Sequence, residues 1–129
     1  MQETSGTEAV VMPRLQDIDE LIAFLPKLYG ENVKYNQALK RLVSDFYRAA
    51  SQECWSDKTY NPAETEMLLQ DADYIKGAGI KEIRTLLTFC QRQERFIEGL
   101  HEAMIRRGVI RSILERLREL RAGDVQGAS

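Results

Sequence analysis

Apolar residues spaced three and four positions apart are the feature that most constrains the fold of this chain. Successive residues of a helix step by about 100°, so this spacing gathers the apolar side chains on one face. No stretch keeps the alternating period of a strand for long, and the sequence therefore predicts an all-α fold. Segments with helical spacing fall at residues 15–25, 35–50, 62–71, 80–92, 94–106 and 109–121.

The length fits one domain, because 129 residues with 43% hydrophobic content can form a single core without cross-links. We predict a compact bundle of five or six helices over residues 15–121. The segments 1–14 and 122–129 are polar or rich in small residues, and they are predicted to be flexible, disordered termini.

Capping residues support several helix ends. Asn61 precedes Pro62 in the pattern of an N-cap followed by proline in the first turn. Gly108 is expected just beyond a helix C-terminus, where the left-handed conformation is needed. Pro26 is expected to end or kink the first helix near Leu25, because it removes a backbone donor from the helix interior.

The spacing also predicts which side chains point into the core. Arg84 and Thr88 are expected on the outer face of the helix at 80–92, opposite Cys90. Cys90 is expected to be a buried, unreactive side chain, because apolar surroundings raise the pKa of a thiol. Four residues are expected to form the buried face of the following helix: Phe96, Ile97, Leu100 and Met104.

Charge is unevenly distributed although the net charge is only −2. Residues 1–75 hold 7 Lys/Arg and 13 Asp/Glu, whereas residues 76–121 hold 11 and 6. This asymmetry is typical either of a partner-binding face or of two halves of a fold that attract each other. The second interpretation is favoured, because a sequence pI near 5.5 is unlike that of a typical nucleic-acid-binding protein.

The composition argues against several kinds of site. Cys54 and Cys90 are too few for a disulfide framework, and with a single histidine they cannot complete a structural zinc site. We therefore predict no metal, no cofactor and a reduced, cytoplasmic setting. No segment approaches the run of about 18 apolar residues that crosses a bilayer, so no membrane partner is expected.

The segment LLTFCQRQERFIEGLHEAMIRRGVIRSILERLRELR resembles the C-terminal half of the bacterial family called domain of unknown function 6508. The resemblance extends through AFLP and the Trp55 loop, and so covers most of residues 15–121. The positions that match the family pattern are Leu86, Leu87, Thr88, Arg92, Arg95, Phe96, Glu98, Gly99, Met104, Gly108, Ile110, Leu114, Arg116 and Leu117.

Two positions depart from that family pattern. Ile97 stands where the family has a cysteine, and Leu100 stands where it has a histidine. His101 is one step along, turned by about 100° on a helix, so it does not replace the missing histidine. The resemblance also associates the family with fusions to ADP-ribose-processing macrodomains. A Cys/His site at these positions, if the family has one, is expected to be lost here.

Three classes of function remain open. The first is a non-catalytic helical protein that binds a partner protein, as an inhibitor, an antitoxin-like protein or a regulatory subunit. The second is a nucleic-acid-binding protein that uses the basic C-terminal helices, which the interleaved acids disfavour. The third is a small enzyme linked to ADP-ribose or nucleotide metabolism. Its candidate residues would be Asp71, Asp73, Glu98 and His101, but no motif of catalytic spacing supports them, and no catalytic residue is predicted.

The candidate partner-binding residues are Arg92, Arg95, Arg84, Trp55 and Tyr60. Arg92 and Arg95 stand where the family pattern has arginines, and Arg suits planar, bidentate recognition of a carboxylate or phosphate. Trp55 and Tyr60 lie in a polar connector, where aromatic residues either anchor a partner or pin the loop onto the helices. We favour pinning by Trp55. Arg92, helped by Arg95, is expected to meet an acidic group of a partner protein.

Overall fold

The computed structural model describes residues 12–30 and 37–127, with side chains to residue 123. Within these ranges the chain is helical and has no strand, which confirms the all-α prediction. The α-helices are α1 (Leu15–Ile22), α2 (Phe24–Tyr29), α3 (Gln37–Ala50), α4 (Pro62–Leu69), α5 (Ala72–Lys76), α6 (Ile80–Arg92), α7 (Leu100–Arg106) and α8 (Val109–Gly127). Two 3₁₀ turns, η1 (Glu53–Trp55) and η2 (Gln93–Arg95), lie between them.

The prediction of five or six helices is too low for the described residues, and two short helices account for the difference. Only Ala23 separates α1 from α2, and Pro26 lies in the first turn of α2, where its missing N–H costs no helical hydrogen bond. Pro26 therefore does not end a helix near Leu25. The helix α5 was not predicted, and the Asp71 carboxylate caps it by accepting from two backbone N–H groups.

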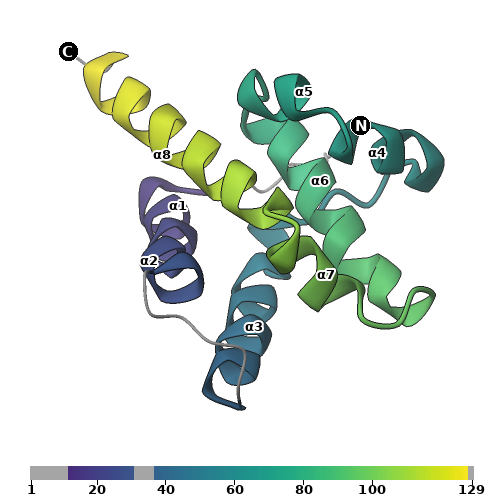
Figure 1. Cartoon of the computed structure of the whole chain (residues 1–129). Coiled ribbons are helices and arrows are strands. Elements are labelled where there is room, and N and C mark those ends of the chain that lie inside the picture. Colours follow the sequence, from purple (N-terminus) through teal and green to yellow (C-terminus); the bar gives the residue numbers. More distant parts are fainter. Residues whose placement is uncertain (1–11, 31–36, 128–129) are drawn as a thin grey trace, which may run out of the picture.

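The core lies where α6, α8 and the shorter helices meet. Figure 1 shows α8 running diagonally across the molecule, with α1 beside it and α3 crossing below. The inward face of α8 is fully buried, as its 3.6-residue period predicts. The side chains with no exposed surface include Leu21, Phe46, Trp55, Ile83, Leu86, Leu87, Cys90, Ile110, Ile113, Leu114 and Leu117.

The predicted caps at Asn61 and Gly108 are confirmed. The Asn61 side chain accepts a hydrogen bond of 3.0 Å from the Glu64 N–H, and Pro62 occupies the first position of α4. Gly108 has φ of +83° and follows the end of α7, which is the left-handed conformation that favours glycine. These two residues fix the start of α4 and the sharp α7–α8 connection.

Cys90 is fully buried, and desolvation raises the pKa of its thiol to about 12. The predicted structural role of Cys90 agrees with this burial, because such a thiol stays protonated and unreactive near neutral pH. Cys54 is also buried and forms no disulfide. Burial is the main cause that raises the pKa of its thiol, and the nearby Asp17 carboxylate raises it further.

Arg84 and Thr88 were expected on an outer face, and this prediction is wrong. Both are buried, because the loop of residues 54–57 folds over that side of α6. Helical spacing gives the direction of a side chain but not what packs against it.

Phe96 and Ile97 were expected on a buried helix face, and this prediction is also wrong, because their side chains are 72% and 43% exposed. The helix expected from residue 94 begins only at Leu100, because η2 and Gly99, with φ of +81°, occupy the chain between α6 and α7.

The structure describes only part of the two terminal segments that were predicted to be flexible. Most of the segment 1–14 lies outside the described residues. The segment 122–129 was predicted to be a flexible tail, but α8 continues through Gly127. In the described part of the chain, no helix combines the length and the apolar character needed to cross a bilayer.

Candidate functional site

The end of α6 and the loop that follows it carry a group of exposed arginine and apolar side chains. We call Arg92, Arg95, Phe96 and Ile97 the crest. Figure 1 shows this loop projecting at the edge of the molecule, away from α1 and α2. The crest begins within the polar sequence QRQER, where the apolar period of α6 stops and η2 begins, and it ends at Ile97.

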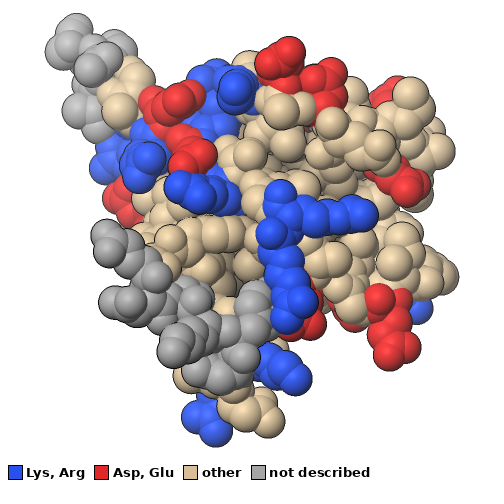
Figure 2. Space-filling model, viewed as in Figure 1, with Lys and Arg blue, Asp and Glu red and all other residues tan. Residues whose placement is uncertain are grey.

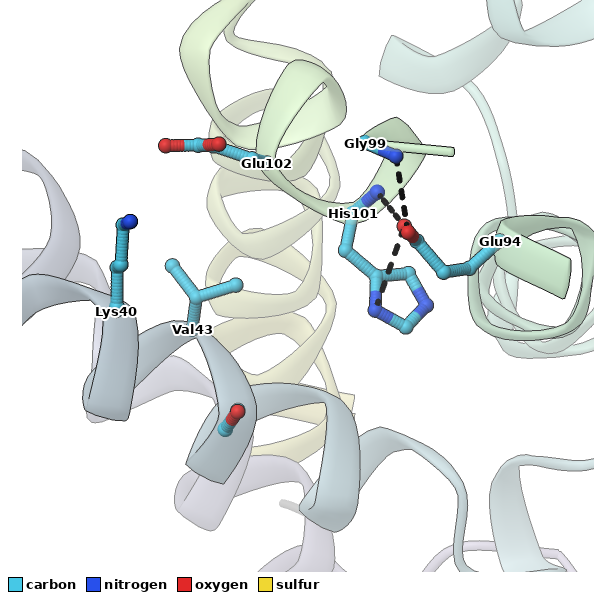
Figure 3. Close-up of a pocket in the computed structure, with 7 residues that line it drawn as sticks. Lys40, Val43, Glu94, Gly99, His101 and Glu102 are labelled. Carbon is cyan, nitrogen blue, oxygen red and sulfur yellow. Dashed lines mark hydrogen bonds and ion pairs between the residues drawn. The ribbon is translucent and has the colours of Figure 1, made fainter. Parts of the chain in front are cut away.

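Glu94 holds the crest in place from within the loop. Its carboxylate accepts the backbone N–H of Gly99 at 2.9 Å and that of His101 at 2.7 Å, as Figure 3 shows. These are the free donors at the start of α7, so the carboxylate acts as a cap supplied from outside the helix. The loop geometry therefore depends on one acidic side chain.

The His101 side chain links the Glu94 cap to α3 and α6. Its ring stacks on Tyr47, with centroids 3.8 Å apart and planes 11° from parallel. Its Nε2 lies 3.0 Å from the Gln91 carbonyl, which can only accept, so Nε2 carries a proton and donates. Nδ1 lies 3.8 Å from the Glu94 carboxylate. These contacts give His101 a packing role, since one ring face and one ring nitrogen are occupied.

The pKa of Glu94 is lowered: burial acts to raise it, but the hydrogen bonds from the His101 and Gly99 N–H groups outweigh burial. A carboxyl whose folded pKa is lowered stabilises the fold above its unfolded pKa, and this contribution disappears as the pH falls through the folded value. The stabilisation by Glu94 is therefore complete above pH 4.5, the ordinary value, and is lost progressively below it.

We expect Glu94→Gln to lower the free energy of unfolding at pH 7 by about 1 kcal/mol, the usual contribution of a helix cap. The difference from the unmodified protein should shrink progressively as the pH falls below 4.5. Urea unfolding at a series of pH values measures both the loss of free energy at pH 7 and its dependence on pH. A difference that stays constant over this range would show that the Glu94 charge does not hold the loop.

Arg92 and Arg95 are exposed, and neither forms an ion pair with a carboxylate among the described residues. The Arg95 guanidinium lies 5.7 Å from the centroid of the Phe96 ring, a distance at which a cation and an aromatic face attract. Both guanidinium groups therefore have hydrogen-bond donors available to a ligand.

Three of the four arginines of α8 differ from those of the crest. Arg111 pairs with Glu115, Arg116 pairs with Glu119, and Arg121 reaches Asp19 on α1. Figure 2 accordingly shows basic and acidic side chains lying among one another over α8. This helix presents mixed charge, whereas the crest presents unpaired arginines.

A hollow of about 740 Å³ lies beside the crest, and we call it the arginine hollow. Tyr60 closes one side of it: its hydroxyl oxygen accepts from the Gln93 side chain at 2.9 Å, and its ring meets Phe89 edge-to-face. The predicted residues Tyr60, Arg92 and Arg95 are thus brought together. The residues that line the arginine hollow are Tyr60, Gln91, Arg92, Glu94, Arg95, Phe96 and His101.

A second hollow of about 570 Å³ lies on the other side of the crest, and we call it the apolar groove. Leu69, Phe89, Leu100 and Met104 are buried residues that form its apolar floor. The remaining lining residues are Glu66, Gln70, Ile97, Arg107 and Val109. A third hollow of about 280 Å³ lies between α3 and α7, beside Glu94 and His101 (Figure 3).

The structure does not bring the other two predicted partner-binding residues to this surface. Arg84 is only 6% exposed, and its guanidinium donates to the carbonyls of Cys54 at 2.9 Å and Ser56 at 2.6 Å. Trp55 has no exposed surface. The interpretation in which Trp55 pins its loop onto the helices is therefore confirmed, and neither side chain is accessible to a partner.

The candidate residues for an enzyme are scattered rather than grouped. Asp71 caps α5, Asp73 lies in the first turn of that helix, and Glu98 is exposed on the crest loop. Within residues 12–30 and 37–123, no three His, Cys, Asp or Glu side chains are placed to hold a metal ion.

The inference from sequence missed the exposure of Phe96 and Ile97 and the capping role of Glu94. A signal for the break was present: the polar run QRQER interrupts the apolar period, and Gly99 follows it within a few residues. The two hollows had no such signal, because residues from α4, α6, α7 and α8 line the apolar groove together.

Comparison with known proteins gives a family match that covers most of the helical region. The sequence profile of a family of unknown function, DUF6508, matches residues 13–123. No curated protein and no solved structure matches the chain. Since the match spans α1 to α7 and most of α8, the chain belongs to the family of unknown function DUF6508.

Proposed function

We propose that this protein is a non-catalytic helical module that binds a partner protein through the crest. Arg92, helped by Arg95, would meet an acidic group of the partner. The observation that carries the proposal is that both guanidinium groups are exposed without a carboxylate partner in the described part of the chain, next to a Phe96 ring that is 72% exposed.

The residue types of the crest are those that dominate protein interfaces. Arginine and aromatic side chains are enriched among the residues whose truncation most weakens binding. An arginine can also grip a carboxylate with two parallel hydrogen bonds. The Glu94 cap fixes the loop before binding, so little ordering entropy would be lost on association. An inhibitor, an antitoxin-like protein or a regulatory subunit would act in this way.

The two competing classes receive less support. A nucleic-acid-binding protein needs a continuous basic surface, and three arginines of α8 are already paired with acids. An enzyme needs a positioned base, and the His101 ring is stacked on Tyr47 with Nε2 bound to a backbone carbonyl. We place the protein in the cytoplasm, in keeping with its two free, buried cysteines.

Replacement of Arg92 by glutamate tests the proposal. The tagged full chain is used to capture proteins from the native host, and mass spectrometry and a nucleic-acid assay identify the eluate. We expect Arg92→Glu to abolish capture of the specific partner, because it places a like charge against the acidic group. The melting temperature should stay nearly unchanged, since the side chain is exposed.

Arg118→Glu is the matched control, because Arg118 is an exposed arginine of α8 that forms no ion pair with a described carboxylate. Capture should survive this change. A folded Arg92→Glu protein that still captures the partner would contradict the proposal. A large fall in its melting temperature would instead assign Arg92 to helix stability.

A further inference from the structure

Consecutive residues of the crest line the arginine hollow and the apolar groove. Phe96 lines the first and Ile97, the next residue, lines the second. Tyr60 of the arginine hollow also meets Phe89 of the apolar groove edge-to-face, with ring centroids 6.5 Å apart. A ligand that lies across the crest could therefore fill both.

The charges at these hollows are mainly positive. Arg92 and Arg95 line one hollow and Arg107 lines the other, and none of the three pairs with a described carboxylate. Of the two acids that line them, Glu94 already accepts two backbone N–H groups, which leaves Glu66 at the groove. A ligand that complements this surface carries negative charge at several points.

The apolar groove adds a requirement that charge alone does not meet. Leu69, Phe89, Leu100 and Met104 are each at least 93% buried and form its floor, whereas Ile97 is 43% exposed at its edge. An apolar floor with a polar rim is the usual anatomy of an interface that receives a large apolar side chain. Water is displaced from such a groove most favourably by an aliphatic or aromatic group.

We propose that the two hollows form one continuous site for an acidic peptide segment of a partner protein. A large apolar side chain of the segment occupies the apolar groove, and its carboxylates meet Arg92, Arg95 and Arg107. This inference rests on the proposed function and deepens it, because it names the recognised element and adds a second contact area to the crest.

The experiment selects ligands for the full chain from a random library of twelve-residue peptides displayed on phage. We expect the enriched peptides to combine two or more Asp or Glu with a nearby large apolar residue. Synthetic copies of the best peptide, with the acids changed to Lys or the apolar residue to Ala, should each bind about tenfold more weakly or worse by fluorescence anisotropy.

Variants of the protein assign the two halves of the site. Arg92→Glu should weaken the best peptide by about tenfold or more, and Ile97→Asp should do the same by placing a charge at the edge of the groove. Met67→Asp is the matched control for Ile97→Asp, because Met67 is 73% exposed on α4 and lines neither hollow. It should leave the affinity unchanged.

Several results would overturn the inference. One is the enrichment of basic peptides, and another is the enrichment of acidic peptides that lack an apolar residue. A third is that no peptide is enriched more strongly than in a selection on an unrelated helical protein. Self-association that Ile97→Asp abolishes, found by sedimentation without peptide enrichment, would assign the groove to a second copy of this chain. A host partner that is lost with Arg92→Glu but kept with Ile97→Asp would retain the proposed function and refute only the continuous site.

Discussion

Trp55→Ala is expected to lower the free energy of unfolding by about 3–5 kcal/mol, the usual cost of truncating a large buried aromatic residue. Trp55 has no exposed surface and closes the 3₁₀ turn Glu53–Trp55 onto α6. Its removal leaves a cavity that the surrounding helices cannot fill. Urea unfolding followed by circular dichroism at 222 nm measures the change.

Trp55→Phe separates the packing of the ring from its polar N–H. The indole Nε1 is buried and has no hydrogen-bond partner among the described residues. Phenylalanine keeps part of the ring volume and removes this unpaired donor, which is costly in the folded state. We therefore expect Trp55→Phe to be clearly less destabilising than Trp55→Ala. Equal losses for the two variants would show that the contribution of Trp55 does not come from ring packing.

Helical spacing predicted the elements that pack through a single apolar face. In α8, Ile110, Ile113, Leu114 and Leu117 are fully buried as expected, because this helix meets its neighbours along one stripe. The caps at Asn61 and Gly108 could also be predicted, because each acts on backbone groups within a few residues of itself. Local rules are sufficient where the determining contacts are local.

Spacing failed where a distant segment or an irregular turn determines exposure. Thr88 is on the face of α6 opposite to Cys90, yet both are buried, because a loop more than thirty residues upstream covers Thr88. Phe96 fits the period of a buried face, but Gly99 in the left-handed conformation breaks the helix and leaves the ring exposed.

The candidate site was predictable only in part, for the same reason. Arg92 and Arg95 are exposed, as their residue type suggests. Tyr60 lies more than thirty positions from them, and only the packing of its ring on Phe89 brings it to the same hollow. A hollow between elements depends on tertiary packing, so neither its position nor its apolar floor follows from the periodicity of any one helix.

The loop that covers α6 is held by an unusual set of hydrogen bonds. The Arg84 guanidinium donates to the carbonyls of Cys54 and Ser56. The Thr88 hydroxyl accepts the Asp57 N–H at 2.8 Å, and its single hydrogen faces the carbonyls of Arg84 at 2.8 Å and Trp55 at 3.1 Å. The Thr85 hydroxyl donates to the Asp57 carboxylate at 2.6 Å. Three side chains of α6 thus bind four consecutive loop residues.

Arg84→Met is expected to lower the free energy of unfolding by about 2–4 kcal/mol. It removes two charge-assisted hydrogen bonds and leaves the Cys54 carbonyl buried without its donor. Methionine keeps much of the length of the side chain, so the loss reports the polar contacts more than the packing. Arg118→Met, on the exposed face of α8, is the matched control and should change stability by no more than about 0.5 kcal/mol.

A double-mutant cycle shows whether Arg84 acts through the Trp55 loop. If Arg84 stabilises the fold by holding that loop over α6, its contribution disappears once the loop is released by Trp55→Ala. The two changes together should then cost less than the sum of the separate losses, by about 1 kcal/mol or more. Additive losses would mean that Arg84 stabilises α6 independently of the loop. Hydrogen bonds to the loop carbonyls would then not be what compensates the desolvation of this buried guanidinium.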